Sequence, residues 1–262
     1  MNVLALVLSA VVMTEPVTLP RTTTLHVKAK ANGVAYKLYV SLPRGYETSR
    51  QRYPVIYTLD ADYSFAVARN VVEHLADREH LRWAIVVSIG YDDNPQNEIA
   101  PYRMHRTRDY TPTHSPDGGY GPEYQKHSGG GAKFRQFLGE ELIPLIDRTY
   151  RTTKERTLVG HSYGGLFSTW TMLTTDLFTG YVIVSPSLWY DDSFIFRLKG
   201  TPAARAYIAA GSIENPIMAR DARRLAARLG PGHKVEILDD ETHNSLFPSA
   251  FSRGIRFVMK GR

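Results

Sequence analysis

Ser162 lies in the five-residue segment G-H-S-Y-G, residues 160–164, where a short apolar run, residues 157–159, meets a helix-like stretch, residues 166–173. The two glycines have no Cβ atoms, so a strand and a helix can approach closely on either side of the serine. Such a turn presents the hydroxyl at a helix N-terminus, where backbone N–H groups can stabilise an oxyanion. This context predicts that Ser162 is a nucleophile. The alternative interpretation is a tight turn without chemistry.

The elements that would position this serine alternate along the chain. The first two strand-like segments flank Asn32-Gly33, a hairpin-type turn, and are expected to pair antiparallel. The later segments are separated by helix-like stretches, which predicts a mostly parallel central sheet with helices on both faces. The pattern as a whole predicts the α/β class and, within it, the α/β-hydrolase fold. The segments with strand composition are residues 22–30, 34–40, 53–60, 83–89, 156–160, 181–184, 206–209 and 235–238.

One stretch, residues 91–131, interrupts this alternation. It is rich in Gly, Pro, Asp, His and Tyr, and its apolar residues follow no sustained period. It comes after a strand, at the edge where α/β sheets bind ligands, so we expect a long substrate-facing insertion. A disordered segment is the alternative. Because no repeat or linker divides the remaining chain, we expect one catalytic domain over residues 21–262.

A serine hydroxyl is a weak nucleophile at neutral pH and needs a general base, usually a histidine oriented by a carboxylate. In α/β-hydrolases the chain order is serine, acid, histidine. His243 follows the last strand-like segment and precedes the final helix-like stretch. It is therefore the predicted base, with a loop histidine of no catalytic role as the alternative. His161, inside the turn, is expected to pack beneath it.

The acid is expected in the loop that follows the strand at residues 206–209. Glu214 is the carboxylate directly after that strand, at the end of the segment G-S-I-E. Asp221 comes one or two turns into the next helix and is expected to point elsewhere. The acidic run at residues 239–241 lies near the predicted base but is also consistent with surface charges. Glu214 is therefore the predicted acid.

Two backbone N–H groups are expected to hold the oxyanion. One should be that of Tyr163, the residue after the nucleophile. The second should come from the loop after the strand at residues 53–60, where Ala61 and Asp62 are the candidates through their main chain.

Composition limits the chemistry that this chain can use. It has 262 residues, which is enough for a substantial core without metals or disulfides. It has no cysteine, which excludes a thiolate nucleophile and a cysteine-ligated metal site. The net charge is +6, but the arginines at residues 220–228 and 253–262 fit solvated helix faces better than a nucleic-acid interface. We expect no cofactor, no metal and a small-molecule ester as the partner; the oligomeric state stays open.

The first twenty residues allow two interpretations. Residues 3–13 are an apolar run with the length of a signal-peptide core, and Leu8-Ser9-Ala10 could precede a cleavage point. No Lys or Arg stands before this run, which is where such a signal usually carries its charge. Residues 1–20 are thus an export signal of a periplasmic or secreted protein, which we favour, or an N-terminal extension of a cytoplasmic one. The run is too short to span a membrane, so no stable membrane insertion is expected.

Several short motifs occur together between about residue 25 and the C-terminus. They are Y-T-L-D-A-D at residues 57–62, R-D-Y-T-P at 108–112, G-H-S-Y-G-G at 160–165, S-P-S-L-W at 185–189, G-S-I-E at 211–214 and T-H-N-S at 242–245. In this combination the chain resembles the Putative esterase branch of the α/β-hydrolases. Within that branch it is most similar to the siderophore esterases, which open enterobactin- and bacillibactin-type trilactones, and to esterase D-like enzymes.

The resemblance implies that Ser162 is the nucleophile, His243 the base and Glu214 the acid. Some members of the branch work with a Ser-His pair, so an acid-free mechanism stays open. Ala61 stands where the family commonly has a glycine, which predicts a tighter oxyanion region. The insertion is richer in Gly and Tyr than expected, so the family's substrate contacts are not transferred.

Four side chains are candidates for binding substrate. Arg103, Arg106 and Arg108 lie in the insertion and are expected either to meet an anionic substrate or to be surface arginines. Trp189, in the S-P-S-L-W motif, is the fourth candidate.

These residues predict a serine carboxylic-ester hydrolase that works through an acyl-serine intermediate on siderophore-type or other small esters. An acyltransferase with the same Ser-His-acid machinery, in which an alcohol replaces water, is the first alternative. A non-catalytic binding protein with a vestigial turn is the second. A serine, a candidate acid and a histidine in the expected order favour an enzyme.

Overall fold

The computed structural model describes residues 14–94 and 98–260, whose strands form one sheet in the order β1-β2-β4-β3-β5-β6-β7-β8. The apolar run at residues 3–13, on which the prediction of an export signal depends, lies outside the described part of the chain. Each predicted strand is confirmed, with ends that shift by a few residues. The strands are β1 Thr22–Lys28, β2 Ala35–Ser41, β3 Tyr53–Leu59, β4 Ile85–Tyr91, β5 Thr152–His161, β6 Gly180–Val184, β7 Arg205–Gly211 and β8 Lys234–Leu238.

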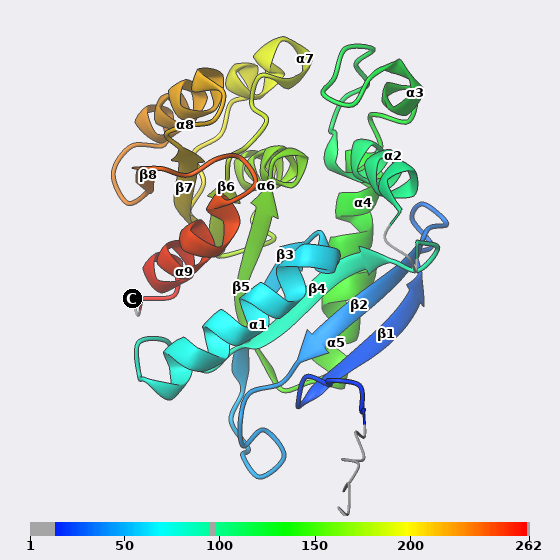
Figure 1. Cartoon of the computed structure of the whole chain (residues 1–262), viewed down its shortest axis with the longest axis vertical. Helices are drawn as coiled ribbons and strands as arrows, with labels where there is room; N and C mark the ends of the chain where they lie inside the picture. The colour runs from blue at the N-terminus through cyan, green and yellow to red at the C-terminus, as the bar shows by residue number, and fades with distance from the viewer. Residues whose placement is uncertain (1–13, 95–97, 261–262) are drawn as a thin grey trace, which may run out of the picture.

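The sheet begins antiparallel and continues parallel, as predicted. β1 pairs with β2 and β2 with β4 in antiparallel register, whereas all later neighbours are parallel. The hairpin between β1 and β2 turns at Gly33, whose φ of +73° is in the left-handed region that glycine adopts freely. Because the parallel strands end at one edge, the loops after β3, β5, β7 and β8 all reach that edge (Figure 1).

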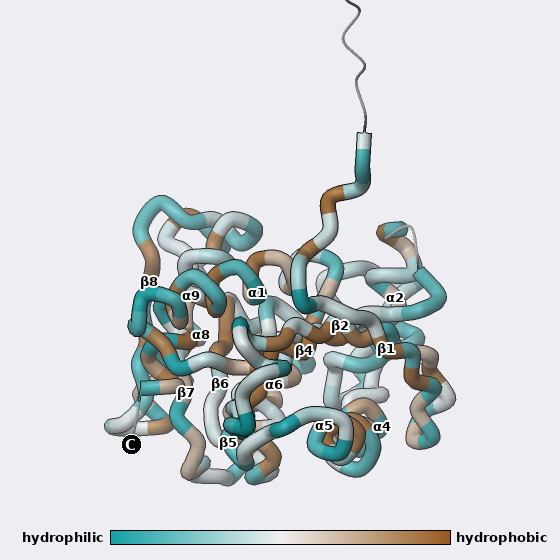
Figure 2. Tube along the Cα trace, turned by 90° about the horizontal axis from the view of Figure 1, so that it is seen from below, coloured by the Kyte–Doolittle hydropathy of each residue, from teal (hydrophilic) through white to brown (hydrophobic). Residues whose placement is uncertain are grey.

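Helices cover both faces of the sheet. On one face lie α1 (Ala61–Asp77) and α9 (Leu246–Val258), which share an apolar cluster with the strands. On the other lie α6 (Tyr163–Thr174), α8 (Pro216–Leu229) and the segment built from α4 (Gly131–Gln136), the π-helical η1 (Phe137–Leu142) and α5 (Ile143–Thr149). All seven residues of β4 are buried, and the tube in Figure 2 shows this strand as a hydrophobic segment between the two helical layers.

The insertion at residues 91–131 contains two helices that its sequence does not indicate, α2 (Ile99–Tyr110) and α3 (Pro122–Gln125). The reason is that α2 buries a polar face, which has no apolar period in the sequence. Asp109, fully buried, accepts hydrogen bonds from Tyr36 of β2 at 2.8 Å and Tyr91 of β4 at 3.1 Å. Its partner Arg108 lies 2.8 Å away.

Two groups of short helices therefore stand above the carboxyl edge of the sheet. Figure 1 shows α2 and α3 on one side, and α8 with α7 (Tyr190–Ser193) on the other, with the start of α6 between them. The 3₁₀ turn η2 (Phe194–Arg197) follows α7. In the part of the chain that the structure describes, no helix has the length and apolar composition needed to cross a membrane.

Candidate active site

Ser162 forms the turn between β5 and α6 in a strained backbone conformation, with φ of 59° and ψ of −117°. Only glycine fits at Gly160, because a Cβ there would lie 2.1 Å from the carbonyl oxygen of Gly164. A Cβ on Gly164 would meet Leu59 at 3.3 Å, a milder restriction, whereas one on Gly165 would lie 2.9 Å from the backbone of Pro186. Backbone strain of this kind in a non-glycine residue is typical of functional sites.

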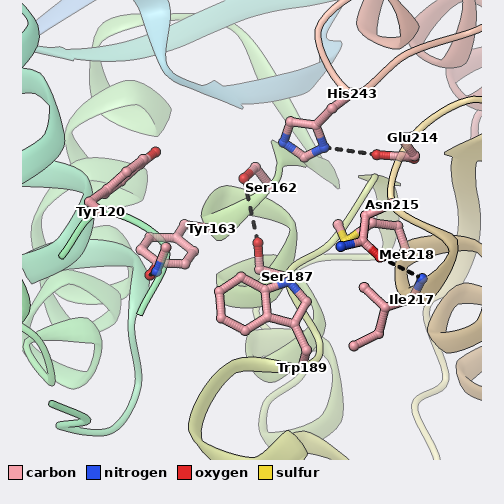
Figure 3. Close-up of a pocket in the computed structure, with 11 residues that line it drawn as sticks. Tyr120, Ser162, Tyr163, Ser187, Trp189, Glu214, Asn215, Ile217, Met218 and His243 are labelled. Carbon is pink, nitrogen blue, oxygen red and sulfur yellow. Dashed lines mark hydrogen bonds and ion pairs between the residues drawn. The ribbon is translucent and has the colours of Figure 1, made fainter. Parts of the chain in front are cut away.

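The loops after β7 and β8 bring a carboxylate and an imidazole together beside this turn. Glu214 Oε2 lies 2.9 Å from His243 Nδ1. The glutamate side chain is 2% exposed and that of the histidine 37%. Figure 3 shows the His243 ring between Ser162 and Glu214, with its second nitrogen on the side of the serine. The structure thus places the three residues predicted as nucleophile, base and acid in one cluster.

Glu214 is held by more than the histidine. Its Oε1 accepts a hydrogen bond of 2.6 Å from the N–H of Gly211, and its Oε2 accepts one from the hydroxyl of Ser185. Burial alone would raise the pKa of Glu214, but hydrogen bonds from His243, Ser185 and Gly211 hold it below its ordinary value. The carboxylate is therefore charged at neutral pH and can orient and stabilise a positively charged imidazole.

The other carboxylates considered from the sequence lie elsewhere. Asp221 is buried on α8 and pairs with Arg220 at 2.9 Å. Asp239 and Asp240 are exposed. Glu241 accepts hydrogen bonds from two serines of its own segment, Ser245 and Ser249. Among the described residues, Glu214 is the carboxylate in hydrogen-bond contact with His243.

The serine hydroxyl has a second hydroxyl beside it. Ser162 Oγ lies 3.4 Å from Ser187 Oγ, and the N–H of Ser187 donates to the carbonyl oxygen of Ser162 at 3.1 Å (Figure 3). In this conformation Ser162 is therefore hydrogen-bonded to Ser187 rather than to His243. Catalytic hydrogen bonds often tighten only when substrate binds, so the contact with Ser187 is compatible with a nucleophilic role for Ser162.

The interpretation of His161 as a residue packed beneath the turn is wrong. Its ring faces the predicted base, with the centroids of His161 and His243 4.5 Å apart, and its Nδ1 lies 3.2 Å from the hydroxyl of Tyr63. Burial, followed by the nearby His243 and Arg106, lowers the pKa of His161 well below its ordinary value. A neutral imidazole thus packs against the base. The sequence carries no signal for this contact, because it depends on where the loop after β8 returns.

Beneath the turn lies a buried ion pair instead. Arg106 of α2 donates to Asp60 at 2.7 Å and to the carbonyl oxygen of His161 at 3.0 Å. Asp60 itself has a left-handed backbone with φ of 58° and precedes α1. This pair ties the end of β3, the insertion and the serine turn into one rigid unit.

The residues predicted to supply backbone oxyanion donors occupy two helix N-termini. Tyr163 is the first residue of α6 and contacts the site. Ala61 and Asp62 are the first two residues of α1, the former buried and the latter exposed. Both helix starts carry backbone N–H groups without an intrahelical acceptor.

Two cavities meet at the cluster. The first has a volume of about 530 Å³ and lies toward α7 and α8; the second has a volume of about 490 Å³ and lies toward α1 and α9. Ser162, His243 and Tyr120 line both. The first is otherwise lined by Gly119, Tyr163, Ser187, Trp189, Glu214, Asn215, Ile217 and Met218. The second is otherwise lined by Tyr63, Val67, Tyr102, Arg106, His161, Asn244, Phe247 and Pro248.

The candidate substrate residues separate into two groups. Trp189 lines the first cavity and Arg106 the second, although the guanidinium of Arg106 is already neutralised by its ion pair. Arg103 lies over the ring of Tyr120, with 5.4 Å from its Cζ to the centroid. Arg108, paired with Asp109, lines neither cavity. Besides Trp189, the aromatic residues that line the cavities are tyrosines and Phe247, which the sequence does not single out because Tyr and Phe are more often core residues.

Comparison with known proteins identifies the family and the fold of this chain. The Putative esterase family matches residues 29–245. The chain is 31% identical to the ferri-bacillibactin esterase BesA of Bacillus subtilis (strain 168) over 272 residues, which cover 92% of this chain and 91% of that protein. It is 30% identical to the siderophore enterobactin esterase of Emericella nidulans over 193 residues, 68% of this chain and 60% of that protein.

The solved structures point the same way. The crystal structure of the BES protein from Bacillus cereus superposes with a TM-score of 0.82 at 27% identity, covering 95% of this chain and all of that one. The siderophore hydrolase EstB from Aspergillus nidulans shares the fold with a TM-score of 0.77 at 22% identity. The sheet order and the serine turn thus define an α/β-hydrolase. The chain belongs to the Putative esterase family.

Proposed function

We propose that this protein is a serine carboxylic-ester hydrolase that works through an acyl-serine intermediate. The observation that carries the proposal is the 2.9 Å contact between Glu214 and His243 beside the strained turn of Ser162, at the junction of two cavities. In the first step, Ser162 Oγ attacks the ester carbonyl carbon while His243 Nε2 takes the hydroxyl proton. His243 Nδ1–H donates to the ionised Glu214 throughout, which stabilises the imidazolium that forms.

The tetrahedral intermediate then collapses. The bond from the carbonyl carbon to the alcohol oxygen breaks, and the leaving alkoxide takes the proton from His243. A water molecule, deprotonated by the same nitrogen, attacks the acyl-serine, and the acid leaves as Ser162 regains its proton. The backbone N–H of Tyr163, together with that of Ala61 or Asp62, holds the oxyanion in both steps. Ser162 must first turn from Ser187 toward His243, which a rotation about χ1 achieves.

The substrate class that we propose is a siderophore-type ester, the trilactone of a catecholate in particular. The proposal rests on two relatives named for bacillibactin and enterobactin ester cleavage, one of them matched over most of both chains. Two cavities of about 530 and 490 Å³ on either side of Ser162 leave space for the two halves of a bulky ester. Aromatic residues in both, such as Trp189 and Tyr102, suit aromatic arms.

The test compares wild type with Ser162→Ala on p-nitrophenyl acetate and on a catecholate trilactone. Loss of the attacking oxygen should lower turnover by on the order of 10⁴-fold or more. Ser252→Ala, a half-buried serine of α9 that lines neither cavity, is the matched control and should behave as wild type. A fluorophosphonate should label wild type and not Ser162→Ala. Activity of Ser162→Ala within tenfold of wild type would rule out the serine mechanism.

A second measurement separates hydrolysis from acyl transfer. Product analysis with and without an added alcohol shows whether the acyl group goes to water or to the alcohol. We expect the free acid to dominate. Transfer as the main outcome at low alcohol concentration would identify an acyltransferase with the same residues.

A further inference from the structure

Tyr120 lies where the two cavities meet. It comes from the segment between α2 and α3, and its ring borders both the cavity toward α8 and the cavity toward α1. In Figure 3 the ring stands across the site from Glu214, on the far side of Ser162. Tyr120, Ser162 and His243 are the residues that line both cavities.

The ring is fixed rather than free. Its hydroxyl is hydrogen-bonded to Arg106, and that guanidinium is itself fully buried and bonded to Asp60 at 2.7 Å. Its ring packs in a T-shaped arrangement against Tyr163, the residue after Ser162, with centroids 5.2 Å apart at 60°. Arg103 covers it from outside, at 5.4 Å from Cζ to the centroid. The Tyr120 side chain is thus contacted by Arg106, Tyr163 and Arg103.

The two cavities differ in their walls. Trp189, Ile217 and Met218 give the first one a partly aliphatic lining. Tyr102 and Phe247 give the second one an aromatic lining. An ester whose carbonyl carbon reaches Ser162 thus has one cavity available for its acyl part and the other for its alcohol part.

We propose that Tyr120 is a specificity-determining residue that divides the substrate site into two compartments and limits the branching of esters that can reach Ser162. The proposal rests on the ester-hydrolase function proposed above. Replacing the phenol ring by a methyl group joins the two compartments, so that a group branched close to the carbonyl no longer meets a wall. Replacing it by phenylalanine keeps the wall and removes only the hydroxyl bond to Arg106.

The experiment measures kcat/KM for p-nitrophenyl diphenylacetate and for p-nitrophenyl acetate, whose leaving groups are identical. The ratio of the two values should rise on the order of tenfold or more in Tyr120→Ala, comparable to other changes of pocket shape. It should stay within about threefold of wild type in Tyr120→Phe. A ratio that Tyr120→Ala leaves unchanged, in an enzyme that still unfolds cooperatively, overturns the proposal.

Two further variants distinguish the effect of joining the two cavities from the effect of widening one of them. Ile217→Ala widens only the first cavity and Val67→Ala only the second, and neither joins them. Each should change the ratio much less than Tyr120→Ala. Equal changes in all three variants would mean that volume, not division, sets the preference, and would overturn the role of Tyr120.

The proposal can fail separately from the function on which it rests. If wild type hydrolyses esters and the ratio does not move, only the role of Tyr120 fails. If wild type hydrolyses no ester, the proposed function fails; the affinities of the two esters for Ser162→Ala, with and without Tyr120→Ala, then measure the division directly. If Tyr120→Ala raises the affinity for the bulky ester relative to that for the small ester, the division is supported. If the ratio of the two affinities does not change, the division is overturned.

Discussion

The hydroxyl of Ser185 donates a hydrogen bond to the same carboxylate oxygen of Glu214 that faces His243. Ser185 Oγ also lies 3.1 Å from His243 Nδ1. The loop after β6 therefore contacts Glu214 and His243 through Ser185, and two residues later it contacts Ser162 through Ser187. The short segment S-P-S, residues 185–187, thus contacts Ser162, Glu214 and His243.

Ser185→Ala should lower kcat about tenfold with little change in KM, because it removes a supporting hydrogen bond but no reacting atom. The hydroxyl helps to hold the pKa of Glu214 below its ordinary value, so its loss should let the carboxylate protonate at higher pH. The acid limb of the pH–rate profile should therefore move to higher pH. Ser185→Thr, which keeps a hydroxyl, should restore part of the loss. An unshifted acid limb in Ser185→Ala would contradict this role.

Glu214→Gln should lower turnover by a few hundred-fold or more, because a neutral amide cannot stabilise the imidazolium of His243. Asp239→Asn removes an exposed carboxylate from the loop that follows β8 and is the matched control, with turnover near wild type. Asp221→Asn should also stay near wild type in the fraction that folds. Steady-state kinetics on p-nitrophenyl acetate decide the matter. A nearly silent Glu214→Gln would mean that Ser162 and His243 work as a pair.

His243→Ala should be almost as damaging as Ser162→Ala, since an unactivated hydroxyl attacks an ester slowly. The double variant should be little worse than either single one, because residues that act as a unit are non-additive. Single-turnover rates of the three variants provide the measurement. Losses that multiply in the double variant would place His243 in a separate step.

His161 predicts a pH dependence of stability. Its pKa is lowered in the folded protein by burial, His243 and Arg106, so below pH of about 6.5 the unfolded chain binds a proton that the folded protein does not. The free energy of unfolding should therefore fall as the pH drops through this value, by up to about 1.4 kcal/mol per pH unit from this group. His80 is exposed, so it is the control for this measurement.

Urea unfolding at pH 7.5 and 5.5 measures this slope, at conditions chosen on both sides of the ordinary histidine pKa. His161→Gln should flatten the pH dependence, because glutamine does not titrate, whereas His80→Gln should leave it as in wild type. Equal slopes in all three proteins would show that His161 is free to protonate in the folded state.

The sheet could be predicted because its strands carry their own signal. All seven residues of β4 are buried, so their side chains are apolar or small on both faces and read as one continuous run. The serine turn was visible for a similar local reason, since Gly160 has no room for a Cβ and the sequence must keep a glycine there. Chain order then led to Glu214 and His243, which the structure places in contact.

The helix α2 could not be predicted, because the residues that stabilise it lie far away in the chain. Its buried side chains include Arg106 and Asp109, whose partners Asp60 and Tyr36 belong to the start of α1 and to β2. A polar residue in a sequence indicates exposure unless its partner is known. The contact between His161 and His243 could not be predicted for the same reason, because the two residues lie far apart in the chain.

The helix α2 is hydrogen-bonded to the serine turn through Arg106, and to β2 and β4 through Asp109. This helix above the site is therefore a fixed part of the scaffold rather than a hinged lid. Only the connection at residues 113–121, which carries Tyr120, spans the gap between these anchors and α3. Because the N–H of Gly119 in that connection donates to the hydroxyl of Tyr163 at 2.9 Å, a change in its length or side chains would also reach the residue after Ser162.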